Sequence, residues 1–294
     1  MLKRVLRRLL SPLLALVVGR AGRAYVTGRT RDSALLVAMR LLGAGYAVTL
    51  AYWDSGESPR QIEAEVAGCI AALAGCGRAP RVAVKAPQLG FDADALGRLA
   101  TQAREAGVGL VLDSHGPDEA TRTLELARVV RDHGADTGVA VAARWDRSPD
   151  DARAAAADGL GVRVVKGQWA QPGRREDDPR LREACDRVLA ALPAGAASIA
   201  THDTRLLERA VGDHRPAGVE LLFGLPARRA LALARRHDLP VRFYVAYGAP
   251  TTGFSPSEVL RRPRLGRDLA GGAVTAGLNP RRRLAEALRG ARVS

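Results

Sequence analysis

The sequence predicts an α/β protein built as a (βα)8 TIM-type barrel, and three observations support this. Eight short runs of β-branched and aliphatic residues alternate with amphipathic stretches rich in alanine and leucine. Most of these runs end at a charged or polar residue, as the strands of such a barrel do at its active face. The length of 294 residues also fits, because barrels of this kind reach ~250 residues as a single domain.

The first half of the chain contains four strand–helix units. The helix predicted over residues 31–42 stops at Gly43, and the run that follows is rich in aliphatic and aromatic residues and ends at Asp54. The same succession then recurs down the chain. The strands predicted in this half cover residues 46–53, 81–84, 108–112 and 138–143. The clearest helices cover residues 31–42, 59–73, 92–104 and 118–131.

The second half repeats the pattern around one short run, residues 162–165. Three of its four residues are β-branched, and Lys166, Gly167 and Trp169 follow it, which places a cation, a flexible joint and an aromatic ring at the carboxyl end of a strand. Because a lysine is costly to bury without a partner, an anionic ligand or a carboxylate should face Lys166. The strands predicted in this half cover residues 162–165, 197–200, 219–223 and 241–247. A helix is predicted over residues 227–237.

The barrel is assigned to residues 31–270, which leaves a segment at each end. In residues 1–30 four basic residues precede an apolar run, residues 9–18, that is too short to span a bilayer. We interpret this segment as a basic amphipathic helical arm that packs on the barrel, with contact of residues 1–20 with a membrane surface as the alternative. Residues 271–294 are assigned as a C-terminal basic tail.

Composition argues against several classes of protein. The formal net charge of +14 comes mainly from arginine, which is spread along the chain without a basic motif interleaved with aromatics, so no nucleic-acid partner is expected. The three cysteines, Cys69, Cys76 and Cys185, have no metal-ligand spacing, which predicts reduced thiols and no metal site. Together these features predict a cytoplasmic protein, with a peripheral position at the inner face of the membrane as the alternative if the arm binds lipid.

The ends of the predicted strands carry more polar chemistry than folding requires. These residues are Asp54, Lys85, Asp113, Arg144, Lys166, His202, Asp203 and Tyr247. In a (βα)8 barrel the carboxyl ends of all strands meet at one face, where active sites lie. Two lysines together with arginine at that face predict a polyanionic ligand such as a phosphate or a dinucleotide.

Taken together, these strand ends resemble the FAD-dependent proline dehydrogenase family. Arg163-Val-Val-Lys166-Gly167-Gln-Trp169 is similar to that family's Arg-Leu-Val-Lys-Gly-Ala-Tyr run, and Ala200-Thr-His-Asp203 to its Ala-Thr-His-Asn or Ala-Thr-His-Asp. Further pieces match in the same order: Lys85 with Gln88-Leu-Gly90, Gly56-Glu57, Asp113, Glu220, and the run from Arg242 to Gly248 that contains Tyr244. The resemblance spans residues 23–263 and implies a distorted barrel that holds non-covalent FAD.

The resemblance also implies a role for each matching residue. Arg163 would lie beside the flavin ring, where its charge favours the reduced form. Lys85 and Asp113 would form an ion pair at the floor of the substrate site, and Tyr244 would shape the pocket. The residues implied to bind the cofactor are Arg163, Lys166, Gly167, Trp169, Thr201, His202 and Asp203. For His202 alone, a core histidine bonded to a carbonyl is the alternative.

Two departures from the family pattern mark a divergent member. The family's fourth strand carries Gln-Ala-Tyr, whose glutamine reaches the flavin, and the same place in this chain reads Ala142-Ala143-Arg144, so that one hydrogen bond to the flavin is lost. The family's last helix carries Tyr-x-x-Arg-Arg, whose arginine pair grips the substrate carboxylate, and this chain has Phe254 in place of the tyrosine and Ser257 and Glu258 in place of the arginines. Arg261 and Arg262 lie one turn further on and are the displaced candidates for the pair, although Pro263 follows at once.

Four functions are compatible with these residues. The first is oxidation of L-proline to 1-pyrroline-5-carboxylate, or of a related cyclic amine, by hydride transfer to flavin N5, with a quinone-type electron acceptor. The second is a diverged flavoenzyme acting on another amine, since Glu258 favours a cation over a carboxylate. The third is a Schiff-base lyase that uses a strand-end lysine. The fourth is a non-catalytic barrel.

Overall fold

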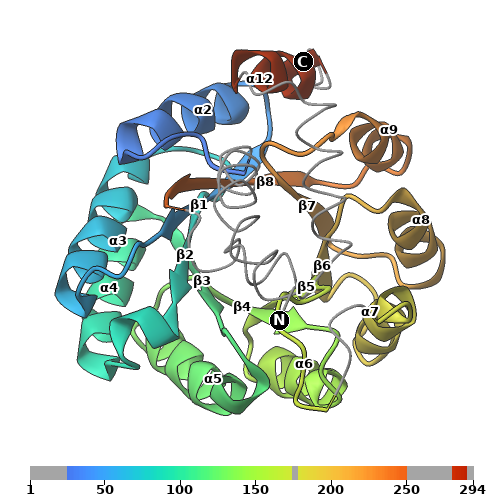
Figure 1. The fold of residues 1–294 in the computed structure, drawn as a ribbon, viewed down its shortest axis with the longest axis horizontal. Helices are drawn as coiled ribbons and strands as arrows, with labels where there is room; N and C mark the ends of the chain where they lie inside the picture. Colours follow the sequence, from blue (N-terminus) through green and yellow to red (C-terminus); the bar gives the residue numbers. More distant parts are fainter. Residues whose placement is uncertain (1–24, 174–177, 250–279, 290–294) are drawn as a thin grey trace, which may run out of the picture.

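The computed structural model describes residues 25–173, 178–249 and 280–289. Within them, eight parallel strands form a closed barrel in sequence order, ringed by helices, so the predicted (βα)8 fold is confirmed (Figure 1). The strands are β1 (Ala47–Trp53), β2 (Arg81–Lys85), β3 (Gly109–Asp113), β4 (Thr137–Ala142), β5 (Gly161–Val165), β6 (Ala197–Ala200), β7 (Gly218–Leu222) and β8 (Val241–Gly248). Each predicted strand is present, with its bounds shifted by at most one residue.

The helices lie on the outside of this barrel. They are α2 (Arg31–Gly43), α3 (Pro59–Leu73), α4 (Ala93–Ala106), α5 (Pro117–Asp132), α6 (Ser148–Ala157), α7 (Leu181–Ala190), α8 (Thr204–Asp213), α9 (Arg228–Arg236) and α12 (Pro280–Arg289), with a short 3-10 helix at Ala86–Leu89. Local sequence sets their ends. Ser58 and Gln61 form a capping box before α3, and Asp92 caps α4, which ends at Gly107 with a φ of 67°.

The sheet of the barrel separates two buried regions: the layer between the strands and the helices, and the space enclosed by the strands. Successive side chains of a strand point to opposite faces, so Val82 belongs to the large aliphatic core shared with the helices, whereas its neighbour Ala83 belongs to a separate cluster inside the barrel. The main apolar core is therefore the layer between strands and helices. The inside of the barrel is left for small and polar side chains.

The barrel closes where β8 pairs with β1 over seven residue pairs, from Ala47 with Arg242 to Trp53 with Gly248. We call this pairing the closing seam. Gly248 has a φ of 103°, and a Cβ there would lie 2.3 Å from the carbonyl oxygen of Trp53. The close approach of the two strands at this point therefore requires glycine.

Helix α12 lies within the segment that the sequence analysis assigned to a basic tail. Leu284 and Ala287 are buried in the main core, and the Tyr46 hydroxyl donates to the Ala287 carbonyl oxygen at 3.0 Å. The helix covers the barrel beside α2 (Figure 1). Most of the predicted N-terminal arm, residues 1–24, lies outside the described residues, so its prediction is untested.

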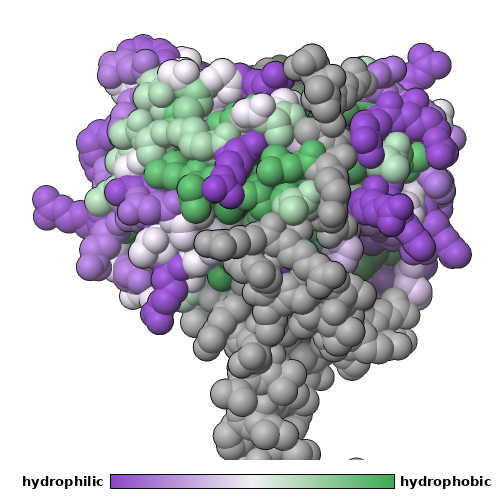
Figure 2. All heavy atoms as spheres, turned by 90° about the horizontal axis from the view of Figure 1, so that it is seen from above, coloured by the Kyte–Doolittle hydropathy of each residue, from purple (hydrophilic) through white to green (hydrophobic). Residues whose placement is uncertain are grey.

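Figure 2 shows the face on the side of α2 and α12, where an apolar area lies among hydrophilic side chains. Among the described residues, the exposed large apolar side chains are Leu36 and Met39, both on α2. None of the described helices is both long and apolar enough to cross a membrane.

Candidate active site at the carboxyl ends of the strands

A buried ionic network occupies the inside of the barrel, centred on Arg163 of β5. One terminal nitrogen of its guanidinium donates to Asp113 of β3 at 2.5 Å, and the other donates to Glu220 of β7 at 2.8 Å. Glu220 accepts a further hydrogen bond of 2.6 Å from the Thr49 hydroxyl on β1. Four strands thus contribute to one network that holds the arginine in place.

The electrostatics of this network keep Arg163 charged. Burial alone would lower its pKa, but the carboxylates of Asp113 and Glu220 outweigh burial and raise the pKa above its ordinary value. The guanidinium also lies 5.3 Å from the centroid of the Tyr244 ring, a cation–π contact. Burial raises the pKa of Tyr244, so its hydroxyl stays protonated. Within the described structure the buried Nε of Arg163 has no hydrogen-bond partner, which leaves one N–H for an acceptor.

Lys85 lies at the end of β2, beside Asp113 in the strand register. Its Nζ donates to the Tyr52 carbonyl oxygen at 3.0 Å and lies 5.8 Å from the centroid of the Trp53 ring. No ion pair joins Lys85 to Asp113 in the described part of the chain, since the carboxylate binds Arg163 instead. The predicted Lys85–Asp113 pair is therefore corrected to an Arg163–Asp113 pair. Burial lowers the pKa of Lys85 to about 8, against the opposing effects of Asp113 and Asp54.

A second charged cluster lies where β5 and β6 end. Asp203 caps helix α8 by accepting from the Leu206 backbone N–H, and its other oxygen accepts from Lys166 at 2.8 Å and from Arg182 at 2.7 Å. Burial would raise the pKa of Asp203, but these two cations lower it to about 2. Two cations on one carboxylate leave a local excess of positive charge. Arg182 comes from α7 and was missed in the sequence analysis, because nothing in the sequence links it to a strand end.

His202 has a structural role, and this corrects its assignment to the cofactor. Its Nε2 accepts from the Leu222 backbone N–H at 2.9 Å, so the proton lies on Nδ1, which faces the Pro226 carbonyl oxygen at 3.2 Å. Burial lowers its pKa to about 4, which keeps the ring neutral at pH 7. Both ring nitrogens are thus used by the backbone. Thr201 accepts from the Asp203 backbone N–H at 3.1 Å and shapes the same turn.

The loop after β5 is fixed by residues that follow β3 and β4. Gly167 has a φ of 90°, and a Cβ there would lie 2.9 Å from the Ala142 Cβ, so only glycine fits. The Trp145 indole donates to the Trp169 carbonyl oxygen at 2.9 Å, and Arg144 donates to that of Gln168 at 2.9 Å. Arg144, the last residue of the Ala142-Ala143-Arg144 run, therefore holds this loop in place. Trp169 itself lies against the His115 ring, with centroids 5.0 Å apart.

The remaining predicted substrate residues, Phe254, Ser257, Glu258, Arg261 and Arg262, lie outside the described residues. Two members of the network, Glu220 and Thr49, were not assigned to the site from the sequence. The signal was present for Glu220: it is a carboxylate at an inward position of an otherwise apolar strand. No group of three or more histidine, cysteine or acidic side chains suited to a metal occurs among the described residues.

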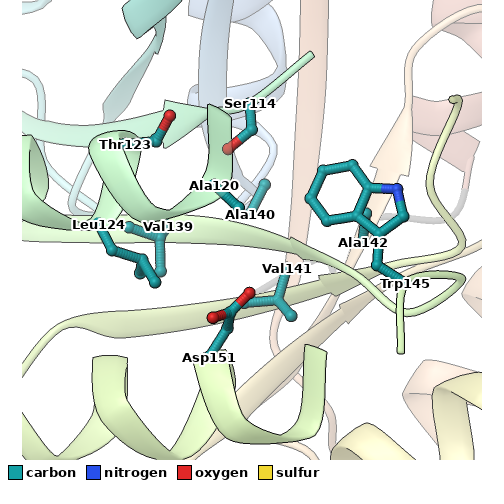
Figure 3. A pocket seen from close by; sticks show the side chains of 10 residues that line it. All are labelled: Ser114, Ala120, Thr123, Leu124, Val139, Ala140, Val141, Ala142, Trp145 and Asp151. Carbon is teal, nitrogen blue, oxygen red and sulfur yellow. The ribbon is translucent and has the colours of Figure 1, made fainter. Parts of the chain in front are cut away.

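A small cavity lies to one side of this network, among residues of β4, α5 and α6 (Figure 3). Its lining includes Val139, Val141, Leu124 and the Trp145 ring, with Asp151 at its edge, and Asp151 is paired with Arg147. Its volume of about 10 Å³ suits about one water molecule. This cavity is therefore too small for a cofactor or a substrate.

The residues at the mouth of the barrel fit a flavin dinucleotide. Arg163 offers a free N–H deep in the barrel, and the rings of Tyr244, Trp53 and Trp169 supply flat apolar surface. Lys166 and Arg182 supply the positive charge that a pyrophosphate needs. The fold and site together define an α/β barrel whose polar residues converge at the carboxyl ends of its strands.

Comparison with solved structures agrees with this class. The chain resembles proline utilization A (PutA) from Bdellovibrio bacteriovorus, inactivated by N-propargylglycine, with a TM-score of 0.59 at 16% identity, over 85% of this chain and 32% of that one. A mutant Bradyrhizobium japonicum PutA gives a TM-score of 0.62 at 19% identity, over 90% and 32%. A PutA structure with proline bound in remote sites gives 0.55 at 20%, over 81% and 32%.

The chain thus spans about a third of the length of these PutA proteins, and the likeness shows a shared fold. No family model and no curated protein matches the sequence.

Proposed function

We propose that the protein is an FAD-dependent oxidoreductase of the proline dehydrogenase type. It oxidises L-proline to 1-pyrroline-5-carboxylate, or a related cyclic amine, and passes the electrons to a quinone-type acceptor. One observation carries the proposal: Lys85, Asp113, Arg163 and Tyr244, each matched to the family by sequence alone, converge in one barrel mouth, with Arg163 in contact with both Asp113 and Tyr244. Such convergence is what a shared site requires.

Each of these residues has a task in that reaction. Bound FAD would supply the hydride acceptor. Arg163, permanently charged, favours the negative charge that a reduced flavin carries, and Asp113 and Glu220 fix its position. Lys166 and Arg182 hold the phosphates, with Gly167 and Trp169 in the adjoining loop. Lys85 and Tyr244 line the substrate side, while Ser257 and Glu258 remain candidates for contact with the amine.

Anaerobic reduction of the bound flavin tests this function. The purified protein, supplied with FAD, should show a flavin absorption band that bleaches on addition of L-proline or another cyclic amine. The substrate panel should include cations without a carboxylate, because Glu258 favours them over proline. Failure to retain FAD, or a bound flavin that no amine reduces, would contradict the proposal.

The phosphate contact can be tested on its own. Replacing Lys166 by alanine should weaken FAD binding by roughly 1.5 to 3 kcal/mol, about tenfold or more in Kd, because a charge-assisted hydrogen bond is lost. Arg209→Ala is the matched control, since this exposed cation lies on α8 and pairs with Asp186 away from the mouth. Isothermal titration with FAD measures both. Equal affinities in the two variants would remove Lys166 from the cofactor site.

One observation favours a second candidate, a lyase that forms a Schiff base. Such an enzyme needs a lysine that is partly neutral near pH 7, and the pKa of Lys85 is lowered to about 8 by burial. Borohydride reduction in the presence of carbonyl compounds would trap the adduct. Because the chain has only three lysines, Lys3, Lys85 and Lys166, peptide mass mapping identifies the site at once. An adduct on Lys85 in a protein without flavin would favour the lyase.

The location proposed from the sequence is the cytoplasm, with peripheral contact of residues 1–20 with the membrane. A quinone-type acceptor in the bilayer would make such contact useful. Vesicle flotation of the full chain, compared with a chain that lacks residues 1–20, measures it directly.

A further inference from the structure

His115 lies in the loop between β3 and α5, two residues after Asp113, and the sequence analysis gave it no role. Its half-buried ring packs against the Trp169 ring, with centroids 5.0 Å apart, so it joins the loop after β3 to the loop after β5. Its backbone N–H donates to the Glu119 carboxylate in the first turn of α5 at 2.9 Å, which fixes the loop. His115 is thus held at the carboxyl face of the barrel, beside the loop proposed to bind the cofactor.

The ring nitrogens of His115 make no hydrogen bond within the described part of the chain. In this His115 differs from His202, whose two ring nitrogens are used by the backbone, and from His133, whose Nδ1 lies 3.4 Å from the Thr101 hydroxyl oxygen. A neutral imidazole has one nitrogen that can accept a proton. His115 therefore offers an acceptor that the described protein itself does not use.

Four charged groups act on the His115 ring, each from a different element: Asp54 after β1, Lys85 at the end of β2, Asp113 at the end of β3 and Glu119 on α5. Burial and the positive charge of Lys85 lower the pKa of His115 below its ordinary value, and the three carboxylates only partly oppose them. The ring is therefore mainly neutral at pH 7. Because Lys85 and Asp113 belong to the proposed substrate side, the ring lies close to that side as well.

The charged groups around the imidazole are less suited to take up a proton. Asp113 is bound by the Arg163 guanidinium, and Asp54 accepts from the Gln88 amide. Lys85, with a pKa lowered to about 8, is mostly protonated at pH 7. This leaves the imidazole as the neutral base of the set.

The proposed reaction needs such a base. A cyclic amine is an ammonium ion at pH 7, yet its nitrogen must be neutral when the neighbouring carbon loses hydride, because the nitrogen lone pair forms the C=N bond. We propose that His115 is the general base that accepts this proton directly from the bound substrate. One N–H bond of the ammonium group breaks and one forms at the imidazole, and the hydride with its two electrons then passes from carbon to the flavin. This inference rests on the proposed function, to which it adds a proton acceptor.

The dependence of kcat/KM on pH tests the proposal. His115→Gln removes the acceptor, so the variant uses only substrate that is already neutral, a fraction that grows about tenfold per pH unit below the amine pKa. The parent should exceed the variant by roughly 10²- to 10⁴-fold at pH 7. This ratio should shrink about tenfold per unit as the pH rises, whereas the titration of Lys85 affects both proteins and cancels. A ratio that is constant between pH 7 and pH 9 would mean a purely structural loss and would overturn the inference.

Chemical rescue provides a second test. His115→Ala leaves room beside Trp169 for free imidazole, which should restore amine oxidation in proportion to the concentration of its neutral form. His133→Ala is the matched control, because this exposed histidine follows α5 at the opposite end of the barrel. The control should keep the parent kcat/KM and should not respond to imidazole. A loss in His115→Ala that imidazole does not restore would overturn the inference.

Acylation by diethyl pyrocarbonate tests the ring nitrogens without any turnover, since the reagent attacks a neutral imidazole nitrogen that has no hydrogen-bond partner. His115 should be acylated faster than His202, and peptide mass mapping measures both. Tetrahydrofuran-2-carboxylate, the ring-oxygen analogue of proline, should slow the acylation of His115 in the FAD-loaded protein and leave that of His133 unchanged. Equal rates at His115 and His202, or no protection by the analogue, would overturn the inference.

These outcomes separate the base from the reaction it serves. Amine-dependent flavin reduction in the parent, with the same pH profile in His115→Gln, would overturn the inference alone. If no amine reduced the flavin of the parent, the inference and the proposed function would fail together.

Discussion

The two ends of the barrel use arginine in opposite ways. At the carboxyl end, Arg163 is buried between two carboxylates and keeps one N–H unassigned. At the amino end, Arg81 pairs with the half-exposed Asp136 at 2.9 Å, and Arg242 donates to the carbonyl oxygens of Val48 and Ala79 at 2.7 and 3.0 Å. At the amino end, Arg242 is used for hydrogen bonds to backbone carbonyl oxygens, which stabilise the barrel. At the carboxyl end, Arg163 holds a positive charge and an N–H group that a ligand can use. The contrast matches the usual division between a stabilising and an active face.

The largest effect should follow from removing the central cation. Arg163→Met leaves Asp113 and Glu220 buried without a counter-charge, which should cost about 3 to 5 kcal/mol in the free energy of unfolding. Urea denaturation measures it, with Arg81→Met as the control at the opposite end of the barrel. Arg163→Lys should be intermediate, because it keeps the charge and loses the forked geometry. If the Met variants at the two ends lose equal stability, the contrast between the ends is wrong.

A smaller effect is expected when one carboxylate of the network becomes neutral. Glu220→Gln keeps the shape of the side chain but removes a charge-assisted bond to Arg163, for a loss of about 1.5 to 3 kcal/mol in unfolding free energy. Thr49→Val tests the neighbouring contact, and the double variant measures their coupling. Because Thr49 donates to Glu220 at 2.6 Å, the two losses should not add. Simple additivity would mean that the two residues act separately.

The dependence of stability on pH tests how much the charge of Asp203 contributes at the carboxyl end of the barrel. The folded pKa of Asp203 is about 2, below the ordinary value of 3.8, so its ion pairs stabilise the fold above the unfolded pKa and are lost as the pH falls from about 4 to 2. Asp203→Asn keeps a capping side chain for α8. The stability difference between parent and variant should therefore be full above about pH 5, fall steadily between about pH 4 and pH 2, and vanish only below pH 2. A difference that stays constant over this range would show that the charge of Asp203 contributes nothing.

The smallest effect is expected at the amino end. The side chains of Arg81 and Asp136 are 24% and 54% exposed, so Arg81→Ala should cost only about 0.2 to 1 kcal/mol of stability, and salt should reduce this further. Thermal unfolding at low and high ionic strength checks both statements. If Arg81→Ala lost as much unfolding free energy as Glu220→Gln, the Arg81–Asp136 pair would have to belong to a buried network like that of the carboxyl end.

The sequence was enough to predict the strands because each is a short run of mainly β-branched and aliphatic residues, and most of these runs end at a polar residue. Partners inside the barrel were harder to predict. Asp113 lies beside Lys85 in the strand register, yet its partner Arg163 comes from two strands further round, because side chains of non-neighbouring strands meet across the barrel. The periodic pattern of apolar residues along the sequence gives the strands, but it does not tell which side chains of different strands meet inside the barrel.

The role of His202 and the place of α12 were not predictable because both depend on contacts with residues distant in the sequence. A histidine at a strand end is suited to a ligand, but both nitrogens of His202 are taken by the backbone around β7, which is remote in sequence. Helix α12 was not predicted because its sequence is dominated by arginine. The two residues that it buries in the core, Leu284 and Ala287, are too few to give a clear amphipathic pattern. Burial against α2, a tertiary contact, decides its place.

The closing seam has a consequence for how the chain folds. Its seven residue pairs exceed the three between β1 and β2, and they join the first strand of the barrel to the last. During synthesis the ribosome releases β1 long before Arg242 emerges, so one edge of β1 waits without its partner. Contacts so distant in sequence are slow to form. We therefore expect closure at β8 to be the last step of barrel formation, and residues 25–28, which bridge to Ala246 of β8, to take their place after it.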